Sequence, residues 1–126
     1  MSQERRQLGK QGEDLACRFL ERKYYSVLAR NFSCPFGELD LICLKDGIVV
    51  FVEVKTRKGM GAILPEESVG FKKRRRLIRC ALYYLKERDL MEEACRFDIV
   101  SVRIRQDGSA RIRILRDCIW ELEGTS

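Results

Sequence analysis

The sequence predicts an α/β domain in which helices flank a mixed central sheet of about five strands. Segments with helical and strand-like hydrophobic periodicity follow one another in the order helix, three strands, helix, two strands. An Asp-Gly pair, the strongest short signal for a β-hairpin, stands between the second and third strand segments. The chain has 126 residues, 45% of them apolar, so residues 1–126 are expected to form a single domain.

The first helix is expected over residues 8–23, because apolar residues recur there at helical spacing. They are Leu8, Leu15, Ala16 and Phe19. Glu13 lies at the edge of this apolar face, where a solvated helix charge is the ordinary interpretation. Gly9 and Gly12 have no side chains, so they would let another backbone approach the helix closely.

Three strands are expected next, over residues 24–32, 38–44 and 48–55. Residues 33–37 separate the first two strands and contain Pro and Gly, which favour turns. The Asp46-Gly47 turn joins the second strand to the third.

A second helix is expected over residues 72–88, with an apolar stripe along one face. The stripe consists of Leu77, Ile78, Ala81 and Leu85. Two further strands are expected over residues 97–104 and 110–115, joined around Asp107-Gly108. No element is assigned to the tail after Asp117.

The hairpin brings charged residues together. A two-residue turn at Asp46-Gly47 places Asp40 directly opposite Glu53, and Glu38 opposite Lys55. Directly opposed residues share a face, with Cβ atoms about 5 Å apart. Glu53 and Lys55 are two residues apart on one strand, so they also point the same way. Three acids and one lysine are therefore expected on one face.

Opposed like charges destabilise a sheet, so the two carboxylates require an explanation. Their face also carries Ile42 and Phe51, and carboxylates near apolar neighbours either share a proton or bind a cation. Magnesium fits, because it takes few protein carboxylates. The opposite face is expected to be core, with Leu39, Leu41, Val52 and Val54. The alternative is an ordinary edge hairpin with solvated charges and a Glu38–Lys55 pair.

Charge indicates the class of binding partner, and composition excludes several catalytic mechanisms. The net charge is +6, and six basic residues between positions 72 and 79 indicate a polyanionic partner. They are Lys72, Lys73, Arg74, Arg75, Arg76 and Arg79. A solvated basic helix face is the alternative for the last three. The chain has no histidine, which excludes Ser-His-Asp triads, Cys-His nucleophiles and nucleases that depend on histidine.

Six cysteines occur without a CxxC pair or a spacing typical of zinc sites. They are Cys17, Cys34, Cys43, Cys80, Cys95 and Cys118. Most are expected in the core, with Cys34 exposed in a loop. No export signal is apparent, so we expect a cytoplasmic location and no disulfides. The longest apolar runs, at 48–52 and 80–85, are too short to cross a bilayer, so no membrane partner is expected.

Several motifs together resemble a known family. Asp40, followed one strand later by Glu-x-Lys, is similar to the core motif of PD-(D/E)XK nucleases, and the whole set resembles the YraN-like family of largely uncharacterised bacterial proteins. The set is Gly12-Glu13-Asp14-Leu15-Ala16, Ala29-Arg30-Asn31-Phe32, Gly37-Glu38-Leu39-Asp40-Leu41-Ile42, Phe51-Val52-Glu53-Val54-Lys55-Thr56-Arg57, Lys73 to Leu77, and Arg96-Phe97-Asp98-Ile99-Val100. Two positions depart from the pattern: Leu39 replaces the usual Pro, and Gly70-Phe71 stands where relatives often have Thr-Pro.

The resemblance implies a restriction-endonuclease-like core, with a layout similar to that of the archaeal Holliday-junction resolvases. In that comparison Glu13, Asp40 and Glu53 match metal-binding positions. With the Val54 carbonyl they are expected to hold Mg²⁺ or Mn²⁺. Lys55 matches the catalytic lysine.

The expected function is metal-dependent hydrolysis of phosphodiester bonds in DNA, with branched or junction DNA among the substrates that the resemblance implies. Glu38 is expected to hold Lys55 when no substrate is bound. The expected nucleic-acid contacts are Arg57, Lys58, Lys72, Lys73, Arg74, Arg75, Arg76 and Arg79. A homodimer is compatible with this function, because junction cleavage needs two cuts. The alternatives are a nucleic-acid-binding module that does not cleave, and a subunit that binds an acidic protein partner.

Overall fold

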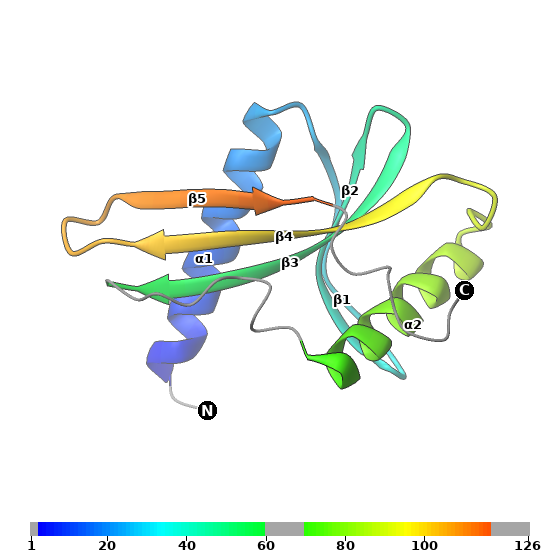
Figure 1. Ribbon diagram of the computed structural model, residues 1–126, viewed down its shortest axis with the longest axis horizontal. Coiled ribbons are helices and arrows are strands. Elements are labelled where there is room, and N and C mark those ends of the chain that lie inside the picture. Colours follow the sequence, from blue (N-terminus) through cyan, green and yellow to red (C-terminus); the bar gives the residue numbers. More distant parts are fainter. Residues whose placement is uncertain (1–2, 60–69, 117–126) are drawn as a thin grey trace.

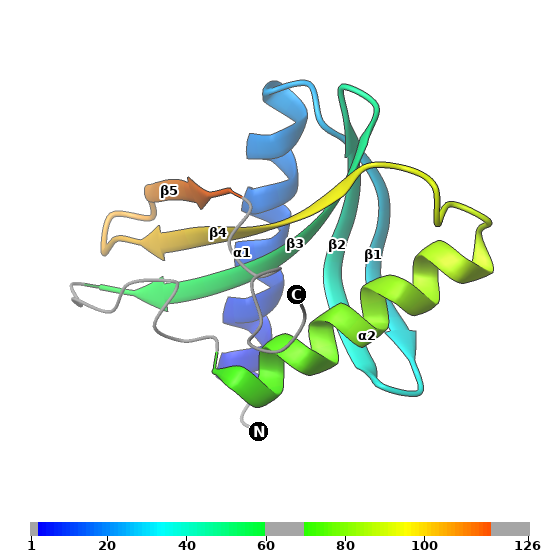
Figure 2. The same ribbon diagram turned by 45° about the vertical axis from the view of Figure 1, so that its right-hand side comes forward.

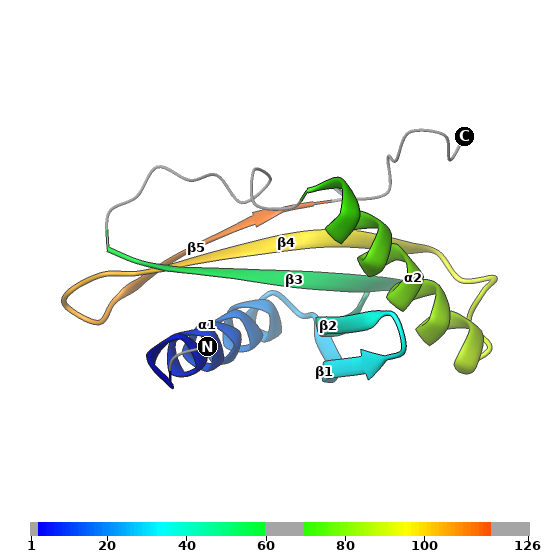
Figure 3. The ribbon, with the colours of Figure 1, turned by 90° about the horizontal axis from the view of Figure 1, so that it is seen from below.

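The computed structural model describes residues 3–59 and 70–116, which form one five-stranded sheet with a helix on each face (Figure 3). In chain order the elements are α1 (Gln3–Arg22), β1 (Ser26–Cys34), β2 (Gly37–Lys45), β3 (Ile48–Lys58), α2 (Phe71–Glu87), β4 (Cys95–Ile104) and β5 (Ala110–Leu115) (Figure 1). This is the predicted α/β order, and it is consistent with a restriction-endonuclease-like fold. No helix in the described part of the chain is long and apolar enough to span a membrane.

The sheet is mixed, with the strands in the order β1-β2-β3-β4-β5. Neighbouring strands run antiparallel, except that β3 and β4 are parallel. The chain passes from β3 to β4 through α2, which crosses one face of the sheet beside β1 and β2 (Figure 2). The middle strand β3 is therefore covered on both faces, which explains its nearly continuous apolar run.

A hydrophobic core fills each side of the sheet. On one side, Ala16 and Leu20 of α1 pack against strand residues such as Val52. On the other side, Leu77 of α2 packs with Phe51 and its neighbours. Any polar group on the inner strands is thus enclosed, and its hydrogen bonds and charge must be satisfied within the protein.

Several element boundaries differ from the predicted ones: β1 continues to Cys34, β3 continues to Lys58, and β4 begins at Cys95. Helix α1 begins at Gln3 and not at residue 8, because its first turns are polar and exposed and carry no apolar periodicity. Glu4 in the first turn suits the positive end of the helix dipole. Strand β1 begins at Ser26 and not at Tyr24, which has a φ of 69° and belongs to the preceding turn.

The cysteines described by the structure lie mostly in the core, as predicted. Cys17, Cys43 and Cys80 are buried free thiols. Cys34, expected to be exposed in a loop, is a half-buried free thiol at the end of β1, and its Sγ lies 3.3 Å from Cys80 Sγ of α2. Cys118 lies outside the described residues.

Helix α1 approaches β3 most closely at Gly12. A Cβ atom added to Gly12 would overlap the side chain of Thr56, whereas one added to Gly9 would meet no described atom within 4 Å. A close approach is therefore found at Gly12, where the neighbour is the Thr56 side chain and not the predicted backbone, and the prediction is wrong for Gly9. The contact fixes the height of the adjacent residue, Glu13, above the sheet.

We predict that Gly12→Ala lowers the free energy of unfolding by about 1–3 kcal/mol, because the added methyl group must displace Thr56 or the helix. Gly9→Ala is the matched control, and we expect it to raise stability by up to about 1 kcal/mol through helix propensity alone. Urea unfolding followed by circular dichroism measures both. Equal stabilities for the two variants would show that the close approach is not a constraint.

Candidate active site

Strands β2 and β3 separate at Asp40. Their pairing follows the predicted register from the turn to the Leu41–Val52 pair, where it ends. One residue further, Asp40 Oδ2 accepts a hydrogen bond from the backbone N–H of Val54 at 2.8 Å, so a side chain replaces a backbone acceptor. Because the N–H and C=O of one strand residue face the same neighbour, the Val54 carbonyl also faces this gap.

The faces of β2 also change at Asp40. Leu39 packs with Ile42 in the core beside α2, whereas Leu41 packs in the core beside α1. The prediction that Leu39 and Leu41 share a face is therefore wrong. The two-residue alternation of a strand is lost where the ladder ends, as it is at a bulge. This irregularity lets the Asp40 carboxylate reach the edge of β3.

Asp40 and Glu53 are close neighbours, as the hairpin geometry predicted. Burial, the charge of Glu53 and a hydrogen bond shared with Glu53 raise the pKa of the Asp40 carboxyl from 3.8 to about 8. At neutral pH Asp40 therefore keeps its proton beside Glu53. The ladder stops one pair short of these residues, so they do not pair directly within it.

Glu53 is the most enclosed acid of the cluster, with 5% of its surface exposed. Its Oε2 lies 2.8 Å from Lys73 Nζ of α2 and 3.9 Å from Lys55 Nζ of β3. Burial and the neighbouring Lys73 lower the pKa of Lys55 to about 8. Burial also acts to lower the pKa of Lys73, but the contact with Glu53 outweighs it and the pKa is raised. The alternative of an ordinary edge hairpin with solvated charges is thus wrong for Glu53.

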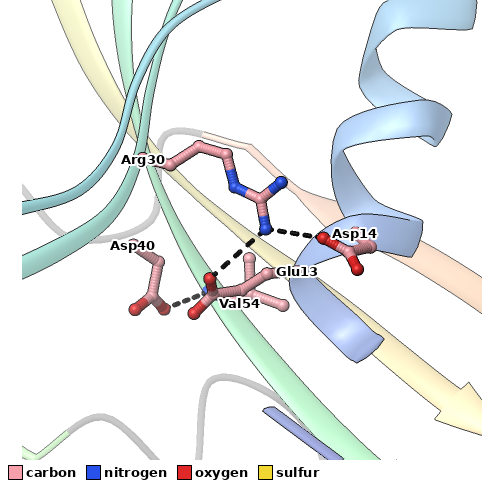
Figure 4. A network of polar contacts seen from close by, with 5 residues as sticks. All are labelled: Glu13, Asp14, Arg30, Asp40 and Val54. Atoms are coloured by element: carbon pink, nitrogen blue, oxygen red, sulfur yellow. Dashed lines mark hydrogen bonds and ion pairs between the residues drawn. The ribbon is translucent and has the colours of Figure 1, made fainter. Parts of the chain in front are cut away.

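Glu13 enters the cluster from α1, held by an arginine of β1 (Figure 4). Arg30 Nη2 lies 3.7 Å from Glu13 Oε1 and donates a hydrogen bond to Asp14 Oδ1 at 2.7 Å. The hydrogen bond from Arg30 lowers the pKa of Asp14. In turn, the charge of Glu13 adds to the factors that raise the pKa of Asp40. Sequence reasoning included Arg30 in a motif but gave it no role.

An open pocket of about 520 Å³ lies beside this cluster. Glu13, Asp40 and Lys55 all line it, and Arg57 and Lys58 lie along the same wall. The pocket runs between α1 and the outer part of β3, so residues that the sequence singled out from α1, β2 and β3 meet in one place.

Other predicted site residues lie outside the cluster formed by Glu13, Asp40, Glu53, Lys55 and Lys73. Glu38 is exposed and pairs with Ser33 of β1, so the expected Glu38–Lys55 pair is absent from the described structure and Lys55 contacts Glu53 instead. Lys58, Lys72, Arg75, Arg76 and Arg79 are exposed.

Three of the basic residues are only partly exposed. Arg57 donates a hydrogen bond from Nη1 to the Thr56 carbonyl at 3.1 Å. Arg74 is half-buried, and its Nε has no hydrogen-bond partner among the described residues. Lys73, expected to contact nucleic acid, lies in the carboxylate cluster. Its position four residues before Leu77, on the buried face of α2, was the signal for this.

The donor set fits a hard divalent cation such as Mg²⁺ or Mn²⁺, which prefers carboxylate and carbonyl oxygens. Glu53 Oε1 is buried and has no hydrogen-bond partner among the described residues. Such an oxygen is costly unless the proton held by the neighbouring Asp40 or a bound cation satisfies it. With the side chains as they stand, no three carboxylate or thiol groups of residues 3–59 and 70–116 converge closely enough to hold one ion.

Comparison with known proteins gives a consistent family. Residues 12–102 match the model of a family described as "Uncharacterised protein family UPF0102". The chain is 43% identical over 107 residues to a UPF0102 protein of Syntrophotalea carbinolica, covering 85% of this chain and 87% of the relative. It is 40% identical over 118 residues to one of Clostridium perfringens, covering 93% and 97%. It is 50% identical over 95 residues to one of Nocardia farcinica, covering 75% of each.

The raised pKa of Asp40 makes stability depend on pH. Between pH 3.8 and about 8, the folded protein keeps a proton on Asp40 that the unfolded chain releases. The free energy of unfolding therefore falls as pH rises through this range. Asp40→Asn removes this titration and keeps an oxygen for the Val54 N–H. In metal-free buffer, we predict that it is about 1–3 kcal/mol more stable than the parent at pH 8, with little gain near pH 4.

Urea unfolding at several pH values in the presence of a chelator measures this effect. Asp46→Asn, which removes the same charge from the exposed turn, is the control and is expected to show no such trend. A constant difference between Asp40→Asn and the parent across this pH range would contradict the raised pKa of Asp40.

Proposed function

The chain belongs to the UPF0102 family, the YraN-like proteins of the PD-(D/E)XK nuclease superfamily, and from this premise we propose that it is a metal-dependent nuclease that hydrolyses phosphodiester bonds in DNA. One observation carries the proposal. The chain buries Glu53 beside Asp40, with one Glu53 oxygen unsatisfied, and lines the adjoining pocket with Lys55. A protein has no structural need for this arrangement, since an apolar pair would cost less.

The residues that would hold Mg²⁺ or Mn²⁺ are Asp40, Glu53 and the Val54 carbonyl, with Glu13 as a further carboxylate from α1. When bound, the ion supplies positive charge for the phosphate and makes a water molecule easier to deprotonate. The chain supplies the positions of these oxygens. Asp40 is fixed by the Val54 N–H, and Glu13 is fixed by Arg30 and by the Gly12 contact.

Lys55 would act on the reacting groups directly. Its ammonium lies on the wall of the pocket next to the carboxylates, where it can orient a water molecule and offset the charge that grows on the phosphate. The lowered pKa of Lys55, about 8, leaves it mostly protonated at neutral pH but close enough to titration to exchange a proton. No histidine is required, which agrees with the composition.

The polyanionic substrate would lie over the basic side chains beside the site. Lys72, Arg75, Arg76 and Arg79 of α2 are exposed, and Arg57 and Lys58 extend from β3 past the pocket. Phosphate contacts of this kind position a nucleic acid without reading its sequence. We therefore propose recognition by backbone charge and shape, with branched DNA as the first substrate to test.

We predict that Lys55→Ala slows cleavage by about 10² or more while Mn²⁺ affinity stays nearly constant, because the lysine stabilises charge electrostatically and is not a ligand. Asp40→Asn should weaken both Mn²⁺ binding and cleavage, because a ligand is lost. The measurement pairs Mn²⁺ affinity with cleavage of branched, single-stranded and duplex DNA. Lys86→Ala, an exposed lysine near the other end of α2, is the control.

Two results would count against the nuclease. If Lys55→Ala cleaves as fast as the parent, the assigned role of Lys55 is wrong. If the parent cleaves none of the substrates with Mg²⁺ or Mn²⁺, a nucleic-acid-binding module that does not cleave becomes the better description.

Binding of nucleic acid should depend strongly on salt. If the exposed basic residues contact about four to six phosphates, log K should fall against log salt concentration with a slope of roughly −3 to −6. The double variant Arg76→Ala/Arg79→Ala should reduce the steepness by about 2, and Lys86→Ala should leave it unchanged. The binding titrations are carried out with a chelator present, so that the nucleic acid is not cleaved during the measurement. Salt-insensitive binding, or equal affinity for heparin, would favour a protein-interaction subunit.

A further inference from the structure

The lysine closest to Glu53 does not come from the β-hairpin. Lys73 Nζ of α2 lies 2.8 Å from Glu53 Oε2, whereas Lys55 Nζ lies 3.9 Å from the same oxygen. Two ammonium groups thus face one carboxylate oxygen, while the other oxygen of Glu53 has no partner in the described residues. Because the two ammonium groups repel each other, one of them is more easily displaced from Oε2 than a single counter-ion would be.

The two lysines differ in how easily their ammonium groups can move away from the Glu53 carboxylate. Lys55 stands on β3, between β2 and β4, and 14% of its side chain is exposed. Lys73 stands in the first turn of α2, and 33% of its side chain is exposed. Its four-carbon stem can carry the ammonium into solvent by side-chain rotation alone. Lys73 is therefore the cation that can give way without any movement of the sheet.

The contact is not needed to hold α2 on the sheet. Leu77, Ala81, Tyr84 and Leu85 already bury the inner face of this helix against the strands. A partly buried ion pair adds little net stability beyond such packing, because desolvation of the two charges offsets their attraction. Removing one member, however, leaves the other buried and uncompensated. The function of Lys73 is thus to compensate the charge of Glu53.

We propose that Lys73 is a displaceable counter-ion. Its ammonium neutralises Glu53 in the metal-free protein and gives up the Glu53 oxygen when a divalent cation enters. Lys73 is then a positioning residue that keeps Glu53 buried and ready for the ion. This inference rests on the proposed metal-dependent function, and it adds that every metal ion must compete with a cation of the chain itself.

Titration of the full-length protein with Mn²⁺ alone, in the absence of nucleic acid, tests the proposal by calorimetry. We expect Lys73→Met to bind Mn²⁺ about tenfold more tightly than the parent, the effect in affinity of one charge-assisted hydrogen bond. Lys72→Met makes the same charge change one residue away on the exposed surface of α2, and it should change the affinity by less than about twofold. Lys73→Arg should bind Mn²⁺ more weakly, because a guanidinium holds a carboxylate with two hydrogen bonds.

Thermal unfolding provides a second readout that a purely structural role would not give. In chelator, Lys73→Met should melt below the parent, because Glu53 loses its counter-ion. Mn²⁺ should then raise its melting temperature more than it raises that of the parent, because the ion replaces the missing charge. Lys73→Arg keeps the charge and the fold, so its weaker binding tests the proposal even if Lys73→Met folds poorly.

The outcomes separate this proposal from the proposed nuclease. If the parent binds Mn²⁺ and Lys73→Met binds it equally or less tightly, the counter-ion role is overturned and the metal centre stands. If neither protein binds Mn²⁺, both the metal centre and the counter-ion are overturned. Binding by Lys73→Met alone would support the proposal most directly, because it would show Lys73 blocking the site in the parent.

Discussion

Burial of Glu53 beside Asp40 is the constraint on which the centre of the molecule depends. Glu53 is buried in a sheet that is covered on both faces, and Asp40 beside it lines an open pocket, so water screens the charge of Glu53 poorly. The chain responds in several ways at once. Asp40 holds a proton, its Oδ2 takes the Val54 N–H, and Lys55 and Lys73 face Glu53. Each response would be needless if the pair were apolar or exposed.

The ladder between β2 and β3 ends for the same reason. In a continuous hairpin, Asp40 and Glu53 would stand side by side on one face of the sheet, and the Asp40 carboxylate would not lie where it accepts the Val54 N–H. The separation after the Leu41–Val52 pair lets Asp40 turn toward the edge of β3 and opens the pocket to Glu13. Helix α1 can deliver Glu13 to this pocket only because Gly12 allows contact with Thr56. The end of the β2–β3 pairing and the contact of Gly12 with Thr56 thus both place carboxylates, those of Asp40 and Glu13, in the same pocket.

Much of this arrangement could be predicted from the sequence, and the failures have physical causes. The hairpin register was predictable because the Asp46-Gly47 turn specifies its own geometry, and the proximity of Asp40 to Glu53 followed from it. The face of the sheet on which Leu39 lies could not be predicted, because strict alternation of faces assumes continuous pairing of β2 with β3. That pairing ends before Leu39.

The positions of Lys73 and Arg30 depend on tertiary packing. Both residues belong to elements that approach β3 and α1 only in the folded protein. Local periodicity could show that Lys73 lies near the buried face of α2, but it could not show which strand residue that face meets. The five residues before Leu8 carry no apolar signal, so the true start of α1 was equally invisible.

The parallel pairing of β3 with β4 also governs when the centre can exist during synthesis. Val49 of β3 pairs with Cys95 of β4, so the strand that bears Glu53 cannot complete its pairing until β4 has been synthesised. A nascent chain that has reached the end of β3 already contains Asp40, Glu53 and Lys55, but it lacks α2 and the strand that closes the far edge. Lys73, the nearest counter-ion of Glu53, is not yet made at that point. The ribosome must release nearly the whole domain before Glu53 acquires the counter-ion and the neighbouring strand that it has in the finished protein.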